Sequence, residues 1–203
     1  MKKIAFSTRY GLEQAVIDRV KDMTRREDKK LNHPLVASIS EWGIDDKGKA
    51  YVTITYSTGL TEDVYPAYQI GEEVAVAQSY RTLIESGYLA DEREDGWVNE
   101  KYIVSAGFRN KMFVRADLMP YRIRITDIRV ERLQDISDKD CIKEGLLAGE
   151  QEPRMYGFRL PKGTVLSFLT PREAFAALID RISGRGTWQR NPWVFAYEFE
   201  LIK

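Results

Sequence analysis

The passage from Ile125 to Leu146 constrains the fold more than any other part of the chain, because its hydrophobic period changes halfway. Apolar residues first alternate with polar ones, with one slip in register at Thr126-Asp127. Alternation of this kind is typical of a half-buried strand. After Leu133 the alternation stops and the signals of a short helix begin. A strand that leads directly into a helix fixes where the last residues of that helix lie.

The short helix is expected between Ser137 and Gly145. Ser137 is a good N-cap, and Asp140 stands where the carboxylate of a capping box reaches back. Gly145 is a typical helix stop. The carboxylate of Glu144 therefore lies at the helix end, either as a surface charge or as a chemical reagent.

Composition sets limits on function. The 203 residues can bury a core as one domain, and 31 basic residues balance 31 acidic ones. The electrostatic field of such a chain as a whole does not attract nucleic acid, although a local basic patch can still do so. The chain has one cysteine, Cys141, which argues against an internal disulfide and a Cys-based metal site. It has one histidine, His33, which argues against a His-rich metal site. No apolar run reaches membrane-spanning length or resembles a secretory signal. We expect a cytoplasmic protein of bacterial or phage origin, without membrane, metal or cofactor.

Local patterns predict the remaining elements. Thr170-Pro171-Arg172-Glu173 is a strong helix start, and Trp193 to Leu201 reads as a central strand. A helix begins near Gly11. We expect a hairpin formed by residues 35–42 and 50–56 and a short helix at 82–90. A solvated loop is expected at 91–96 and an exposed loop at 147–163. Short strands are expected at 4–6, 74–77, 102–104 and 112–114. These short strands with a few helices indicate an α+β protein on a small mixed or closed sheet.

Three segments, taken in order, resemble one family. The first, Ile4 to Arg26, ends in V-K-D-M-T-R-R; the second is Ile125 to Leu146; the third, Phe175 to Phe199, ends in N-P-W-V-F-A-Y-E-F. Together they resemble the ASCH domains, a branch of the PUA-like superfamily, most closely the ASCH-like proteins of phages and prophages. The resemblance implies a small mixed β-barrel with flanking short helices, formed by one domain over residues 1–203. Insertions around 83–109 and 147–163 have no counterpart in minimal ASCH domains.

The chain departs from the family pattern at three places. Arg19 stands where the family usually has Gly before the Lys, and Asp22 stands where it has Thr after the Lys. Gly71-Glu72 is not followed by the family's V-R-E-x-W-like string. The Arg and Glu of that string are missing, which puts in question any ligand contact that they make in relatives.

Some small ASCH proteins are amidohydrolases that deacetylate N4-acetylcytidine with a Lys, a Thr and a Glu. The resemblance places these catalytic roles on Lys21, Thr24 and Glu144. A Thr hydroxyl becomes a nucleophile only when a base takes its proton, and Lys is a base only if its pKa is lowered. Arg25 and Arg26 lower that pKa, whereas a nearby Glu144 raises it. Glu144 can instead pass the proton to the leaving amine.

The candidate ligand-binding residues carry positive charge or an aromatic ring. Arg25 and Arg26 can bind a phosphate bidentately, and a charged strand end is the plainer explanation. Trp188, beside Arg185 in the G-R-G-T-W-Q-R loop, is the best candidate for stacking on a base. Aromatic residues are more often part of the core, as we expect for Trp193. The other tryptophans that can offer a platform are Trp42 and Trp97.

Three functions stay open. The first, which we expect, is a module that binds RNA or a modified nucleoside in a cleft. The second is an amidohydrolase of N4-acetylcytidine or a similar nucleoside, with a Lys-activated Thr nucleophile. The third is a phage or prophage interaction protein whose inserted segments are the working surface and whose cleft is vestigial. The ligand and the oligomeric state do not follow from the sequence.

Overall fold

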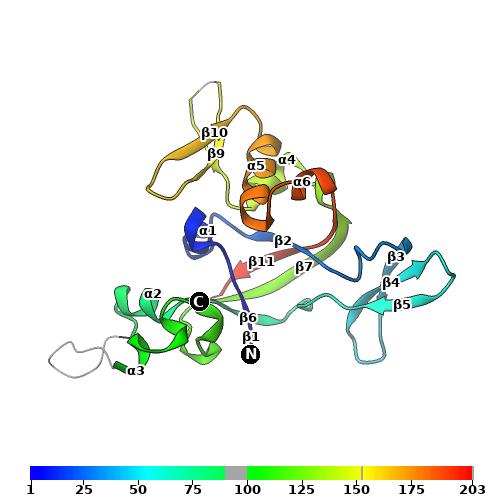
Figure 1. Ribbon diagram of the computed structural model, residues 1–203, viewed down its shortest axis with the longest axis horizontal. Helices are drawn as coiled ribbons and strands as arrows, with labels where there is room; N and C mark the ends of the chain where they lie inside the picture. The colour runs from blue at the N-terminus through cyan, green and yellow to red at the C-terminus, as the bar shows by residue number, and fades with distance from the viewer. Residues whose placement is uncertain (90–99, 152, 203) are drawn as a thin grey trace.

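The computed structural model describes residues 1–89, 100–151 and 153–202, and a five-stranded mixed sheet lies at its centre (Figure 1). Along this sheet the order is β1-β6-β7-β11-β2. β1 pairs parallel with β6, and the other neighbours are antiparallel. The strands are β1 (Lys2–Ile4), β6 (Glu73–Val76), β7 (Arg122–Arg132), β11 (Trp193–Leu201) and β2 (Met23–Glu27). In the described residues β1 and β2 are unpaired edges, so the protein is α+β with an open sheet, not the closed barrel that we expected.

The long strands β7 and β11 form the middle of the sheet. Glu198 pairs with Asp127 and Phe199 pairs with Ile125, so Thr126 is an extra residue in β7. This β-bulge confirms the expected slip in register. Because of it, Ile125 and the apolar residues that follow Asp127 remain on one buried face, although the simple alternation is broken.

The strand–helix passage is confirmed, with one correction. α4 (Asp138–Lys143) begins after Ser137, whose Oγ accepts from the Asp140 backbone N–H at 3.1 Å. Gly145 follows the helix with φ +94°, a conformation that suits glycine. The capping-box role of Asp140 is wrong. Its carboxylate accepts instead from Arg129 Nη2 at 2.9 Å, a tertiary partner that a local pattern does not reveal.

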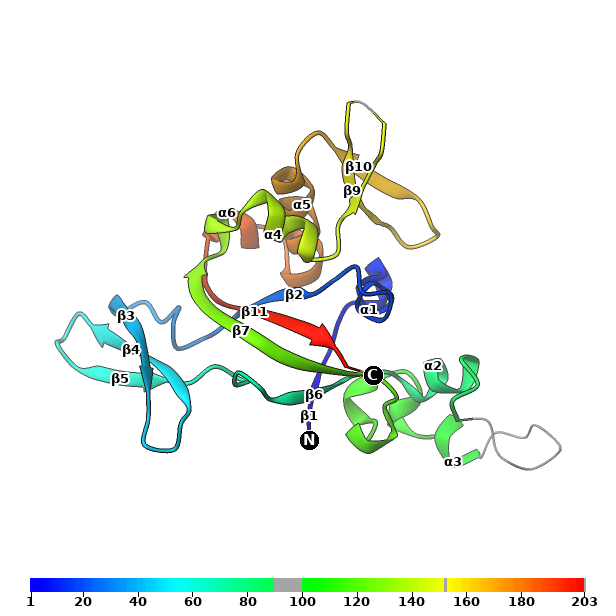
Figure 2. The ribbon, with the colours of Figure 1, turned by 180° about the vertical axis from the view of Figure 1, so that it is seen from behind.

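The helix α5 (Pro171–Ser183) covers one face of the sheet together with α4 and α6 (Thr187–Arg190), as Figure 2 shows from behind. Its predicted start is confirmed. The Thr170 hydroxyl accepts from the Glu173 backbone N–H at 3.2 Å, and the Glu173 carboxylate accepts from the Thr170 N–H at 3.2 Å. None of the helices in the described part of the chain is both long and apolar enough to cross a lipid bilayer.

Two three-stranded sheets flank the centre. The predicted hairpin is confirmed as β3 (Val36–Ile44) and β4 (Ala50–Tyr56), and β5 (Thr61–Val64) adds a third strand. The segment 147–163 is not simply an exposed loop. It contributes β8 (Leu147–Ala148) and β9 (Tyr156–Arg159) to a sheet with β10 (Val165–Phe168). Phe158 in β9 is 1% exposed because it packs into the main core.

The lobe around residues 80–119 is helical, with its own small core. The strands expected at 102–104 and 112–114 are wrong, because short apolar runs do not distinguish a strand from one helical turn. The lobe holds α2 (Tyr80–Glu85), α3 (Glu100–Ile103) and three short 3-10 turns. The loop expected at 91–96 and Trp97 lie outside the described residues. The 3-10 turns in the described residues are η1 (Thr8–Tyr10), η2 (Ala106–Phe108), η3 (Lys111–Phe113), η4 (Ala116–Leu118) and η5 (Leu133–Asp135).

The first helix is shorter than its apolar spacing suggests. α1 (Leu12–Ile17) ends before Arg19, whose φ of +59° is incompatible with a continuing helix. Val20 is 46% exposed although it continues the helical spacing. The chain then turns and forms β2, the edge strand of the central sheet.

We predict that Thr170→Ala removes one half of the α5 capping box and lowers the free energy of unfolding by about 1 kcal/mol. Urea denaturation followed by circular dichroism measures the change. Thr58→Ala is the control, since Thr58 lies in an exposed turn. Equal stability of the two variants would contradict a stabilising cap at Thr170.

Candidate functional site

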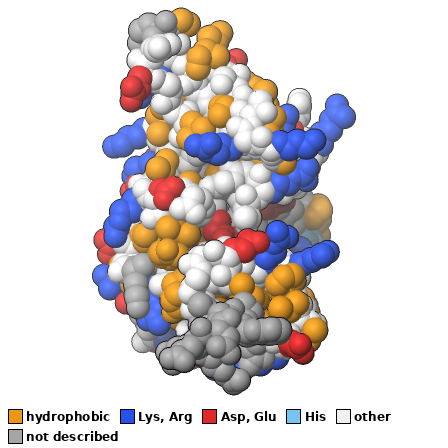
Figure 3. Space-filling view, turned by 90° about the vertical axis from the view of Figure 1, so that its left-hand side faces the viewer, with side chains coloured by type: hydrophobic (Ala, Val, Ile, Leu, Met, Phe, Trp, Pro, Cys, Tyr) orange, Lys and Arg blue, Asp and Glu red, His pale blue; other side chains and the backbone are white. Residues whose placement is uncertain are grey.

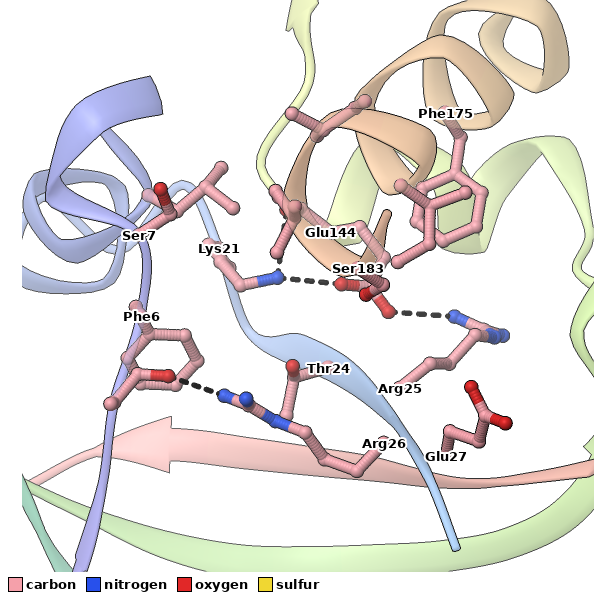
Figure 4. Close-up of a pocket in the computed structure, with 15 residues that line it drawn as sticks. Phe6, Ser7, Lys21, Thr24, Arg25, Arg26, Glu27, Glu144, Phe175 and Ser183 are labelled. Carbon is pink, nitrogen blue, oxygen red and sulfur yellow. Dashed lines mark hydrogen bonds and ion pairs between the residues drawn. The ribbon is translucent and has the colours of Figure 1, made fainter. Parts of the chain in front are cut away.

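A cavity of about 320 Å³ opens along the outer edge of β2 (Figure 4). Three elements enclose it: β2, the segment that follows β1, and the C-terminal half of α5. Apolar and polar side chains line it in nearly equal number, and small-molecule sites likewise combine apolar walls with polar groups that orient the ligand. The lining residues are Ala5, Phe6, Ser7, Leu12, Lys21, Thr24, Arg25, Arg26, Glu27, Glu144, Phe175, Leu178, Ile179, Ile182 and Ser183.

Lys21 and Glu144 form a buried ion pair at the inner end of the cavity. Lys21 Nζ donates to Glu144 Oε2 at 2.6 Å, to the Glu144 carbonyl at 2.8 Å and to the Met23 carbonyl at 2.6 Å. The two side chains are 1% and 7% exposed. Burial lowers the pKa of Lys21, and the Glu144 carboxylate opposes this shift. All three protons of the ammonium group are thereby bound by oxygen acceptors.

Arg25 holds Glu144 from the other side. Its side chain is 1% exposed, and its Nη1 donates to Glu144 Oε1 at 3.1 Å. Its Nε donates to Glu131 at 2.7 Å and its Nη2 to Asp140 at 3.3 Å. Burial raises the pKa of Asp140, but the neighbouring guanidinium groups, chiefly Arg129, outweigh this and hold it below its usual range. The Arg25 guanidinium is thus occupied by carboxylates and is not available to a ligand phosphate.

Thr24 and Arg26 line the cavity, and each has a polar group without a hydrogen-bond partner among the described residues. Thr24 is 5% exposed, and no described residue hydrogen-bonds its hydroxyl, which Figure 4 places on the cavity side. Arg26 Nη2 donates to the Ala5 carbonyl at 2.5 Å, across the opening between β2 and the segment after β1. Its guanidinium lies 5.7 Å from the centre of the Phe6 ring. Its Nε is buried without a partner among the described residues.

The inserted lobe holds one wall of this cavity. Lys111 Nζ donates to the Phe6 carbonyl, to Thr8 Oγ1 at 3.1 Å and to Glu13 Oε2 at 2.6 Å. Glu13 is 4% exposed, so this pair is largely protected from water. A lysine of the lobe therefore fixes the backbone that carries the Phe6 ring.

The structure does not bring Trp188 and Arg185 into the cavity lining. Trp188 packs edge-on against Phe175, with 6.1 Å between ring centres, and the Arg172 guanidinium lies 5.1 Å from its ring centre. Both contacts are those of a partly buried packing residue. Arg185 is exposed in the turn before α6. The other described tryptophans, Trp42 and Trp193, line a separate depression against Val130.

Sequence reasoning missed the apolar walls and the supporting carboxylates. Phe6, Leu178 and Ile179 belong to no sequence motif that indicates a site. The sequence pattern places Asp140 in a helix capping box and not beside Arg25. One signal was present: Ile182 extends the apolar stripe of α5 but is 40% exposed, as expected for a residue beside an opening. Among the described residues, no group of three or more His, Cys, Asp and Glu side chains is arranged to hold a metal ion.

We predict strong coupling between Lys21 and Glu144 in stability. Lys21→Met and Glu144→Gln each leave a buried charge with fewer partners, so each is expected to lower the free energy of unfolding by about 3 kcal/mol. The double variant should lose much less than the sum, as a urea-denaturation cycle measures. Lys143→Met is the control, because its partner Glu198 is 33% exposed and such pairs contribute at most about 1 kcal/mol. Additive losses would contradict the coupling.

No protein-family model, curated protein or solved structure matches this chain. The cavity and its charged groups are therefore the basis on which a function is proposed.

Proposed function

We propose that the protein binds RNA or a modified nucleoside in the cavity beside β2. One observation carries this proposal: the charges at the back of the cavity are satisfied internally, whereas the Thr24 hydroxyl and Arg26 Nε have no partner in the described chain. Polar groups without partners in a protected site cost free energy that a ligand can recover. The cavity volume of about 320 Å³ is at the small end of the range for small-molecule sites.

The character of the surface supports a local site. On the face in Figure 3, basic and acidic side chains are interspersed with hydrophobic ones, and no extended basic area dominates. The formal net charge is zero. Affinity for a nucleoside or a nucleotide within RNA must then come from the groups of the cavity itself. Arg26 is the cationic group best placed there, because Arg25 is committed to three carboxylates.

A PUA-like fold of the ASCH type is part of the proposal, with a cytoplasmic, phage- or prophage-type protein as its setting. The order of elements supports it: a short strand, a helix, the K-D-M-T-R-R string, a long strand with a capped helix, and a closing helix and strand. In this chain the proposed barrel is left open between β1 and β2, where the Arg26 side chain bridges to Ala5.

Hydrolysis of an acetylated nucleoside is the second candidate, favoured by the free Thr24 hydroxyl in the same cavity as Lys21. Thr24 Oγ1 would attack the acetyl carbon while a neutral Lys21 takes its proton. The protonated nucleoside amine would then leave, and water would release acetate from Thr24. Lys21 must lose a proton first. Burial favours that loss, but Glu144 opposes it, and Lys21 Nζ makes no hydrogen bond to Thr24. Binding of a nucleoside without hydrolysis is therefore the function that we propose first.

We predict that Arg26→Ala weakens nucleoside binding about tenfold or more, because a charged donor is lost from the site. Isothermal titration calorimetry with cytidine, uridine and N4-acetylcytidine measures the affinity. Arg185→Ala removes the same charge from an exposed turn outside the cavity and should leave the affinity unchanged. Equal loss in both variants would indicate a general charge effect and would contradict binding in this cavity.

We predict a specific pH dependence if the hydrolytic candidate is correct. Lys21 acts as a base only when neutral, and burial lowers its pKa from 10.5. Hence kcat/KM for N4-acetylcytidine should rise with pH and level off below pH 10.5. Chromatographic detection of released cytidine measures the rate. Thr24→Ala should abolish turnover, and Thr24→Ser should keep part of it. Turnover that survives Thr24→Ala would rule out the threonine nucleophile.

A further inference from the structure

One side of the β2 backbone faces away from the sheet. Phe199 N–H donates to the Asp22 carbonyl at 2.8 Å, so Asp22 belongs to a hydrogen-bonded pair with β11. Bonded and non-bonded pairs alternate along an antiparallel ladder. Thr24 and Arg26 therefore bond to β11 through their backbones. The backbone N–H and C=O of Arg25 point to the outer edge, where the cavity lies.

Two observations support this orientation. The Met23 carbonyl, two residues before Arg25, accepts from Lys21 Nζ at 2.6 Å on the cavity side. Arg25 as a whole is 6% exposed although its side chain is only 1% exposed, so most of its accessible surface is backbone. In the β2–β11 ladder Arg25 and Ala196 form a non-bonded pair by this alternation, and outside the ladder no described residue hydrogen-bonds the Arg25 N–H or C=O. Arg25 thus lines the cavity with a free donor and a free acceptor, side by side.

We infer that the backbone of Arg25 binds the Watson–Crick edge of an unpaired pyrimidine base. This inference rests on the proposed function and names its ligand class. A pyrimidine carries a donor and an acceptor on adjacent positions of that edge, which complements the N–H and C=O of one strand residue. The edge is occupied in a duplex, so the site takes a free nucleoside or a nucleotide in single-stranded RNA.

The shape of the cavity favours a flat ring over an extended peptide. A peptide that extends a sheet needs a row of free backbone groups. β2 has five residues, and its Met23 carbonyl is already bound by Lys21. Only Arg25 and Glu27 are left along the outer edge. Phe6 and the apolar side chains Leu178 and Ile179 supply the walls for a planar ring, and the small volume suits a single-ring base.

The test compares methyl groups on and off the Watson–Crick edge, with the whole chain as the protein. Uridine is compared with 3-methyluridine and 5-methyluridine, and cytidine with N4,N4-dimethylcytidine and 5-methylcytidine. In whichever series binds more tightly, methylation on the edge should weaken binding tenfold or more. Methylation at position 5 should change it less than threefold. The Arg25 amide resonance should shift on saturation, and its hydrogen exchange should slow.

The outcomes separate the inference from the function on which it rests. If nucleosides bind but edge methylation has no effect, or the Arg25 amide does not respond, the inference is overturned and nucleoside binding in the cavity survives. Duplex RNA that binds as tightly as single-stranded RNA of the same sequence also overturns the inference. If no nucleoside or RNA binds at millimolar concentration, the proposed function fails, and the inference fails with it.

Discussion

The buried ion pair of Lys21 and Glu144 is the interaction on which the rest of the structure depends. An isolated ammonium or carboxylate in this position would cost several kcal/mol, which the pair avoids through mutual hydrogen bonds and the Met23 carbonyl. The pair ties the start of β2 to the end of α4. Arg25 strengthens the same connection by holding Glu144 at 3.1 Å and Asp140 at 3.3 Å. Two segments that are far apart in the sequence are thereby fixed side by side.

This arrangement decides which polar groups of the cavity are left without a protein partner. Because Lys21, Glu144 and Arg25 satisfy one another, they set the position of β2. The groups left for recognition are the Thr24 hydroxyl, the Arg26 guanidinium and the outer backbone edge of the strand. The sheet stays open at that edge, and the apolar half of α5 covers it without pairing with it. The buried charges thus hold β2 in place, while the backbone groups of its outer edge are the ones that the proposed binding uses.

Local patterns predicted the elements well wherever their signals came from neighbouring residues. The slip at Thr126, the N-cap at Ser137 and the capping box at Thr170 are all confirmed. Prediction failed where a distant partner competed with a local one. Asp140 had the position for a capping box, but Arg129 offers its carboxylate an ion pair in which both partners are charged. The edge strand β2 was missed for a similar reason, since its charged residues are buried only by partners elsewhere in the chain.

The sequence by itself determined the α+β class, the two long central strands and the capped helices, because these follow from periodicity and from hydrogen bonds between near neighbours. It also pointed to Lys21, Thr24 and Glu144, and all three line one cavity. Only the tertiary structure decided that the sheet is open, that Arg25 faces carboxylates and that Trp188 packs outside the cavity. The Lys21–Glu144 contact spans 123 residues of sequence. Whether such groups meet depends on how the whole chain packs, and no local pattern carries that information.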